Sequence, residues 1–99
     1  MSEVVRRLLV AYDITDDRRR EQIAHLLESY GDRVQYSVFL VDGRPAAFVR
    51  MRRRLESLID SGSDSLLFCD LGPRASLDAD RFAIIGRSRP LTPPGPLIL

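Results

Sequence analysis

One aspartate closes an apolar run of the chain, and a cluster of arginines follows it. Asp13 stands near the end of the run from Val4 to Ile14, and the cluster comprises Arg18, Arg19 and Arg20. Carboxylates are preferred ligands of Mg²⁺, and guanidinium groups bind phosphate oxygens in pairs. A carboxylate beside concentrated positive charge therefore predicts chemistry on a phosphodiester, in which a metal at Asp13 polarises the phosphate and activates water.

A single carboxylate makes a poor magnesium site, and two interpretations of Asp13 stay open. Mg²⁺ usually takes one or two carboxylates and keeps several waters, so a two-fold dimer with Asp13 near its axis would present two. An Asp after a strand also commonly makes an Asx turn with no catalytic role. Asp16 and Asp17 are better explained as residues that start the following helix.

Other kinds of catalytic site are not supported by the residues present. The chain has one His and one Cys, so it lacks a Ser-His-Asp set, a zinc-binding spacing and an internal disulfide. It also has no Gly-rich phosphate loop. The lone Cys69 fits a reducing compartment such as the cytoplasm, and no apolar stretch suits a signal peptide or a membrane span.

Composition and charge narrow the class of protein without naming a ligand. The length of 99 residues is typical of a single domain. The net charge of +1 does not by itself indicate a nucleic-acid-binding protein. All fifteen basic residues are Arg, which suits bidentate phosphate contact but is equally explained by a GC-rich genome. Three of them, Arg50, Arg53 and Arg54, point away from the apolar stripe of a predicted helix and are candidates for contacts to a duplex backbone.

Hydrophobic periodicity predicts that strands and helices alternate. Strands are expected at 4–14, 33–41, 65–71 and 82–86, and helices at about 16–30 and 45–61. Gly31 is interpreted as the left-handed residue that ends the first helix. This order predicts a two-layer α/β sandwich, which becomes the ferredoxin-like βαββαβ arrangement if 33–41 splits into a hairpin.

One face of the predicted sheet has no helix to cover it. Leu9, Ala11, Phe39 and either Leu66 or Leu67 are expected on that face. A second copy of the chain is the simplest cover, which predicts a symmetric dimer.

Three segments together resemble the CRISPR-associated Cas-two family. They are 10–14 (Val-Ala-Tyr-Asp-Ile), 16–20 (Asp-Asp-Arg-Arg-Arg) and 31–39 (Gly-Asp-Arg-Val-Gln-Tyr-Ser-Val-Phe), and 64–66 (Asp-Ser-Leu) fits a further patch. The resemblance implies an α+β, ferredoxin-like βαββαβ two-layer sandwich that is homodimeric and has an extra C-terminal strand at 82–86. The chain is then divided into a domain at 1–86 and a Pro-rich C-terminal tail at 87–99.

The resemblance also implies a function in CRISPR adaptation, in which the dimer bridges two Cas-one integrase dimers and holds the incoming spacer duplex. Several members are described as Mg²⁺-dependent endonucleases that act on single-stranded RNA or double-stranded DNA. Asp13 matches the metal ligand of the family, and its basic positions fall within 18–20. The residues implied to border the cleft or to contact nucleic acid in the second motif are Arg33, Gln35, Ser37 and Phe39, with Tyr12 beside Asp13.

Three functions stay open at this point. The first is a nucleic-acid-binding scaffold, which does not need Asp13. The second is an endonuclease, which needs Asp13 for cleavage. The third is an unrelated ferredoxin-like regulatory domain that binds a small ligand at its dimer interface. A steep salt dependence of nucleic-acid binding distinguishes the first two functions from the third.

Overall fold

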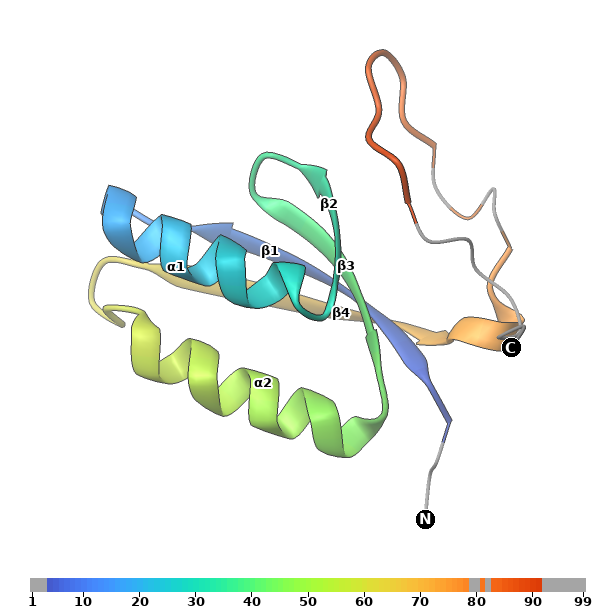
Figure 1. Ribbon diagram of the computed structural model, residues 1–99, viewed down its shortest axis with the longest axis horizontal. Helices are drawn as coiled ribbons and strands as arrows, with labels where there is room; N and C mark the ends of the chain where they lie inside the picture. Colours follow the sequence, from blue (N-terminus) through green and yellow to red (C-terminus); the bar gives the residue numbers. More distant parts are fainter. Residues whose placement is uncertain (1–3, 79–80, 82, 92–99) are drawn as a thin grey trace.

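The computed structural model describes residues 4–78, 81 and 83–91, and in it two helices cover one face of a sheet (Figure 1). The sheet is antiparallel throughout, in the order β2-β3-β1-β4. Its strands are β1 (Arg6–Asp13), β2 (Gly31–Gln35), β3 (Val38–Gly43) and β4 (Ser65–Pro73), its helices are α1 (Asp17–Glu28) and α2 (Pro45–Leu58), and a 3₁₀ turn at Arg74–Ser76 follows. This is the ferredoxin-like βαββαβ arrangement, so the predicted fold class is confirmed.

The segment 33–41 divides into a hairpin, as the ferredoxin-like alternative requires. Strand β2 ends at Gln35 and β3 begins at Val38, so Tyr36 and Ser37 form the turn. The pairing of the two strands shifts between Arg33 and Gln35. Such a bulge reorients the side chains around it, and here it lies directly beside the turn that reaches the end of β1.

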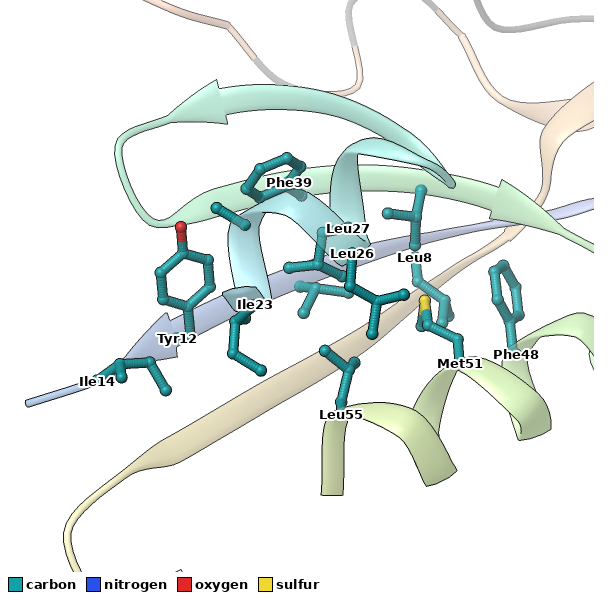
Figure 2. Close-up of a cluster of buried hydrophobic side chains, with 13 residues drawn as sticks. Leu8, Tyr12, Ile14, Ile23, Leu26, Leu27, Phe39, Phe48, Met51 and Leu55 are labelled. Atoms are coloured by element: carbon teal, nitrogen blue, oxygen red, sulfur yellow. The ribbon is translucent and has the colours of Figure 1, made fainter. Parts of the chain in front are cut away.

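The hydrophobic core lies between the sheet and the two helices (Figure 2). Leu8, Val10 and Tyr12 alternate along β1 and are buried in this core, to which the helices contribute Ile23, Leu26, Leu27, Phe48, Met51 and Leu55. Burial of each such side chain contributes about 1.5–3 kcal/mol relative to exposure. The helices of the described residues are too short or too polar to cross a bilayer.

The predicted outer-face position of Phe39 is wrong. Phe39 lies directly opposite Val10 in the β1–β3 register, and residues that lie opposite each other in an antiparallel pair share one face. Phe39 is therefore fully buried under the helices, and Leu40, opposite Leu9, takes the outer position. A shift of one residue in the expected register is enough to cause this error.

The outer face of the sheet nevertheless has an apolar centre. Leu9 and Ala11 of β1 lie opposite Cys69 and Leu67 of β4, and Leu67 is 60% exposed. Leu66 packs against the core, so Leu67 is the outer-face residue of the predicted pair. This apolar strip is the surface on which the predicted dimer depends.

The predicted strand at 82–86 is not formed in the part of it that the structure describes. Ala83 to Ile85 have no regular secondary structure, and Gly86 adopts φ +95°, outside the extended region. Ile85 is fully exposed. Phe82 and most of the predicted tail (92–99) lie outside the described residues.

Gly31 begins β2 and does not end α1 in a left-handed conformation. The C-cap of α1 is Ser29, and Gly31 is not among the glycines with positive φ. Its function is to allow a close approach, because a Cβ at this position would lie 2.0 Å from the carbonyl oxygen of Leu40 and 2.7 Å from the Cα of Val41.

We therefore expect Gly31→Ala to lower the free energy of unfolding by about 1–3 kcal/mol, since the backbone of β3 must move to accept the methyl group. Urea denaturation measures the change. Gly62→Ala is the matched control, because the nearest atom to its added Cβ is an Asp60 carboxylate oxygen at 3.4 Å. Equal stability of the two variants would contradict the close-approach explanation.

Candidate functional site

The carboxylate of Asp13 lies at the exposed end of the interior strand β1. Asp13 is paired with Ser65 of β4, and the neighbouring Tyr12 amide donates to the carbonyl of Ser37 at 3.0 Å. The start of β4 and the hairpin turn therefore flank Asp13. Strand alternation places it on the outer face with Leu9 and Ala11. Among the described residues, no hydrogen bond or ion pair occupies its side chain.

Two adjacent grooves open beside this strand end. The Asp13 groove, of about 280 Å³, is lined by Tyr12, Asp13, Ile14, Arg20, Tyr36 and Ser37. The α1–hairpin groove, of about 580 Å³, is lined by Tyr12, Asp17, Arg20, Glu21, Ala24, His25, Glu28, Arg33 and Tyr36. Both grooves share Tyr12, Arg20 and Tyr36, so a ligand at Asp13 can extend from one into the other.

The other carboxylates near Asp13 already have partners. Asp16 caps α1 by accepting from the Arg19 amide at 2.9 Å, and Asp17 pairs with Arg20 at 2.6 Å. This agrees with the interpretation of both residues as helix-start residues. Within the described residues, no group of three or more His, Cys, Asp or Glu side chains is placed to hold a metal.

Asp13 fits Mg²⁺ as one ligand of a shared or largely hydrated ion. Mg²⁺ is commonly bound through one or two carboxylates together with waters and substrate phosphate oxygens. An exposed carboxylate with no partner among the described residues, at the edge of an open groove, supplies one such ligand per chain. The sequence-based expectation that a second copy supplies a second carboxylate stays a prediction.

Arg19 is held in an ion pair with Asp64. Its Nε donates to Asp64 Oδ2 at 2.7 Å and its Nη2 to Oδ1 at 3.2 Å. The Asp64 side chain is completely buried and also accepts from the amides of Thr15 and Asp60. These contacts, the Arg19 hydrogen bonds foremost, hold the pKa of Asp64 well below its usual range although burial opposes them. The structure thus gives the guanidinium of Arg19 a structural partner in place of a phosphate.

Arg20 is the arginine of the cluster that reaches the grooves. Its Nη1 donates to Asp17 at 2.6 Å and its Nη2 to the carbonyl of Ile14 at 2.9 Å. The hydrogen bond to Asp17 is the main reason that its pKa is raised, with a smaller contribution from the nearby phenol of Tyr36. Arg20 is therefore fixed between Asp13 and the hairpin turn. Arg18 is exposed and lines neither groove, although it borders a depression with Glu21 and His25, which also line the α1–hairpin groove.

Arg33 lies between aromatic rings on the hairpin side of the larger groove. The centre of its guanidinium is 5.2 Å from the ring centroid of Phe39 and 5.9 Å from that of Tyr36. Its ion pair with Glu28 is long, at 3.8 Å, and its buried Nε has no hydrogen-bond partner among the residues that the structure describes. Cation–π contacts thus hold Arg33 in place and leave part of its hydrogen-bonding capacity unused.

The predicted cleft residues are divided between the grooves and the core. Tyr12 lines both grooves and donates from its hydroxyl to the Tyr36 carbonyl at 3.2 Å; burial is the main reason that its pKa is raised. Ser37 lines the Asp13 groove. Gln35 is exposed on β2 and lines neither groove, and Phe39 is a core residue beneath Arg33.

Arg50, Arg53 and Arg54 are exposed on α2, as the helical periodicity predicts. None of the three lines either groove, so the structure does not bring them to the Asp13 site. The periodicity missed two features of the site. Asp64 lies in the 64–66 segment that resembles the family, but periodicity does not indicate its ion pair because Arg19 is 45 positions away. Tyr36 lies in the 31–39 segment and was given no role there; an aromatic ring in a hairpin turn, where small polar residues are usual, is the signal that could have marked it.

Comparison with known proteins decides the family. The family model for CRISPR associated protein Cas2 matches residues 6–78, which contain all four strands, both helices and Asp13. The chain belongs to the Cas2 family. The predicted resemblance is therefore confirmed over the part of the chain that forms the ferredoxin-like unit.

Individual Cas2 proteins match over most of their length. The chain is 44% identical to a CRISPR-associated endoribonuclease Cas2 of Synechocystis sp., over 92% of this chain and 96% of that protein. It resembles the crystal structure of Streptococcus pyogenes Cas2 with a TM-score of 0.71 and 35% identity, over 81% of this chain and 99% of that one. It also resembles a chain of a partial Cas6-RT-Cas1–Cas2 complex, with a TM-score of 0.62 and 25% identity, over 87% and 97% of the two chains.

Proposed function

We propose that this Cas2 protein is a nucleic-acid-binding homodimer that bridges Cas1 integrase dimers in CRISPR adaptation, and that it also cleaves phosphodiesters with Mg²⁺. The observation that carries the proposal is the exposed carboxylate of Asp13, which has no partner within residues 4–78, 81 and 83–91, beside a groove in which Arg20 is fixed. The endonuclease names of relatives and the similarity to a chain of a Cas1–Cas2 complex support it. The exposed free thiol of Cys69 suits the cytoplasm.

The outer face of the sheet supports the dimer. Leu67 is 60% exposed there, beside partly exposed Leu9 and Ala11. A second copy packed sheet against sheet covers this apolar strip and brings a second Asp13 to the same side of the molecule. Two carboxylates then complete the ligand set that one chain lacks.

The residues around Asp13 bind and orient the phosphodiester. Arg20, held by Asp17 and by the Ile14 carbonyl, directs its positive charge at the Asp13 groove and attracts phosphate oxygens. Ser37, which lines the same groove, offers a hydroxyl for hydrogen bonding. Asp13 provides the negative charge that binds a cation, and Mg²⁺ bound there supplies Lewis acidity toward the phosphate and an activated water.

The direct test is cleavage of single-stranded RNA and of blunt double-stranded DNA, each with Mg²⁺ and with EDTA. Cleavage is expected only with Mg²⁺, and the substrate cut faster identifies the physiological polymer. Native mass spectrometry of the same protein is expected to show dimers. Cleavage that survives chelation contradicts the metal-dependent mechanism, and monomers at working concentration contradict the shared site.

The bridging function predicts a separate effect on α2. Replacing Arg50, Arg53 and Arg54 together by Gln should weaken binding to a DNA duplex and flatten its salt dependence, by about 0.9 in the log–log slope for each phosphate contact removed. Fluorescence anisotropy in EDTA, across a salt series, measures this slope. Arg81→Gln, an exposed arginine outside both helices, is the control. An unchanged slope in the triple variant places the duplex on another surface.

A further inference from the structure

We infer that the α1–hairpin groove holds one unpaired nucleobase, stacked on Tyr36, next to the phosphate bound at Asp13. This inference rests on the proposed function, because it names the part of a nucleic acid that enters the site. It assigns a ligand to a groove that the phosphodiester chemistry at Asp13 does not use.

Tyr36 is placed as a stacking platform. Its side chain is 64% exposed although it is one of the largest apolar side chains on the surface. It lies in the two-residue turn of the hairpin, and its own carbonyl is fixed by the Tyr12 hydroxyl. Arg33 lies over its ring at 5.9 Å, and Arg20 lies near its phenol. An exposed aromatic ring with a guanidinium over it is the type of surface on which bases stack.

The charges that line the groove favour a neutral ligand. Asp17, Glu21 and Glu28 contribute three carboxylates, and Arg20 and Arg33 contribute two guanidiniums. The carboxylates oppose a phosphate inside the groove, and the guanidiniums oppose a cation beside Tyr36. A flat, uncharged ring with both hydrogen-bond donors and acceptors can bind to the carboxylates and to the guanidiniums, and a nucleobase is such a ring.

The unused hydrogen-bonding capacity of Arg33 also points to a ligand. Its buried Nε finds no hydrogen-bond partner in the described part of the chain, and its contact to Glu28 is long at 3.8 Å. An acceptor atom of a base would take a hydrogen bond from the Arg33 guanidinium. An exocyclic amino group of the base would donate a hydrogen bond to the Glu28 carboxylate. The volume of about 580 Å³ lies within the range of small-molecule sites, about 300–1,000 Å³.

The two grooves are arranged for adjacent parts of one nucleotide. They share Tyr12, Arg20 and Tyr36, so a phosphate at Asp13 and a base on Tyr36 are neighbours. A base inside a duplex is stacked and paired and cannot enter. The groove therefore favours single strands, overhangs and unpaired positions over blunt duplex.

The test is binding of a short single strand that carries 2-aminopurine, in EDTA so that no cleavage occurs, at one fixed salt concentration. Tyr36→Ala is expected to weaken single-strand binding about tenfold and to keep the affinity for a blunt duplex. Tyr36→Phe, which keeps the ring, is expected to match wild type and to quench 2-aminopurine equally. Val49→Ala, a half-exposed apolar residue on α2, is the matched control.

Three results would overturn the inference. The first is that Tyr36→Ala binds single strands as well as wild type does. The second is that Tyr36→Ala loses single-strand and duplex binding equally, and the third is that Tyr36→Phe loses as much single-strand binding as Tyr36→Ala. In each case the proposed function stands, because wild type still binds nucleic acid. If wild type binds neither form, the proposed function fails together with the inference.

Discussion

Asp13→Asn is expected to abolish Mg²⁺-dependent cleavage and to leave the fold, the dimer and nucleic-acid binding intact. The amide keeps the shape of the side chain but removes the charge that binds the cation. Loss of a residue that merely supports a metal ligand typically lowers activity 10–100-fold, so loss of the ligand should lower it by at least about a hundredfold. Single-turnover cleavage at saturating Mg²⁺ measures the effect.

The control for this prediction is Asp70→Asn, which changes a carboxylate of β4 that pairs with Arg6 away from the grooves. It should cleave as wild type does. The thermal midpoint of Asp13→Asn should stay unchanged, because no partner of Asp13 within the described residues is lost. Full cleavage by Asp13→Asn would remove the nuclease half of the proposal and leave the bridging half standing.

Asp64→Asn is expected to cause the largest loss of stability of any conservative change at this site. Both carboxylate oxygens accept hydrogen bonds, Oδ1 from Thr15 and Arg19, and Oδ2 from Arg19 and Asp60. An amide turns one of these acceptors into a donor that faces other donors, and it leaves Arg19 without its counter-ion. We expect the thermal midpoint to fall by roughly 10 °C.

The pH dependence of this loss follows from the lowered pKa of Asp64. A carboxylate whose folded pKa lies below its unfolded pKa contributes stability that is complete above the unfolded value, 3.8, and is lost as pH falls below it. The gap between wild type and Asp64→Asn should be constant from about pH 5 to 8 and should narrow below about pH 4. Thermal melts across this range measure it. Two results would contradict this explanation. One is a difference between wild type and Asp64→Asn that already narrows near pH 6, and the other is an equally large difference for Asp70→Asn, which breaks the exposed Arg6–Asp70 pair.

The order of the elements was predictable because the patterns that specify it are local. Leu8, Val10 and Tyr12 alternate along β1, and Ile23 and Leu27 of α1 repeat at helical spacing. These periods of two and 3.6 residues can be recognised from residues that are close together in the sequence. The strand at 82–86 was predicted from the same kind of short apolar run, but a run alone does not supply the neighbouring strand that a ladder needs.

Face assignments were less predictable, because they depend on register. Phe39 and Leu40 are adjacent apolar residues, and either satisfies an alternating pattern. The pairing of Phe39 with Val10 across β1 and β3, and the bulge in β2, decide which of the two faces the helices, although both side chains are buried. A shift of one residue exchanges the faces of every side chain beyond it.

The sequence by itself determined the βαββαβ order and the position of Asp13 at a strand end, since both follow from residues that are close in the chain. Only the tertiary structure decided which arginines of the cluster are available. Arg19 is paired with a buried carboxylate 45 positions away, while Arg20 is directed at the grooves. Adjacent residues of the same type differ because their side chains meet partners from distant segments, and no local spacing encodes those contacts.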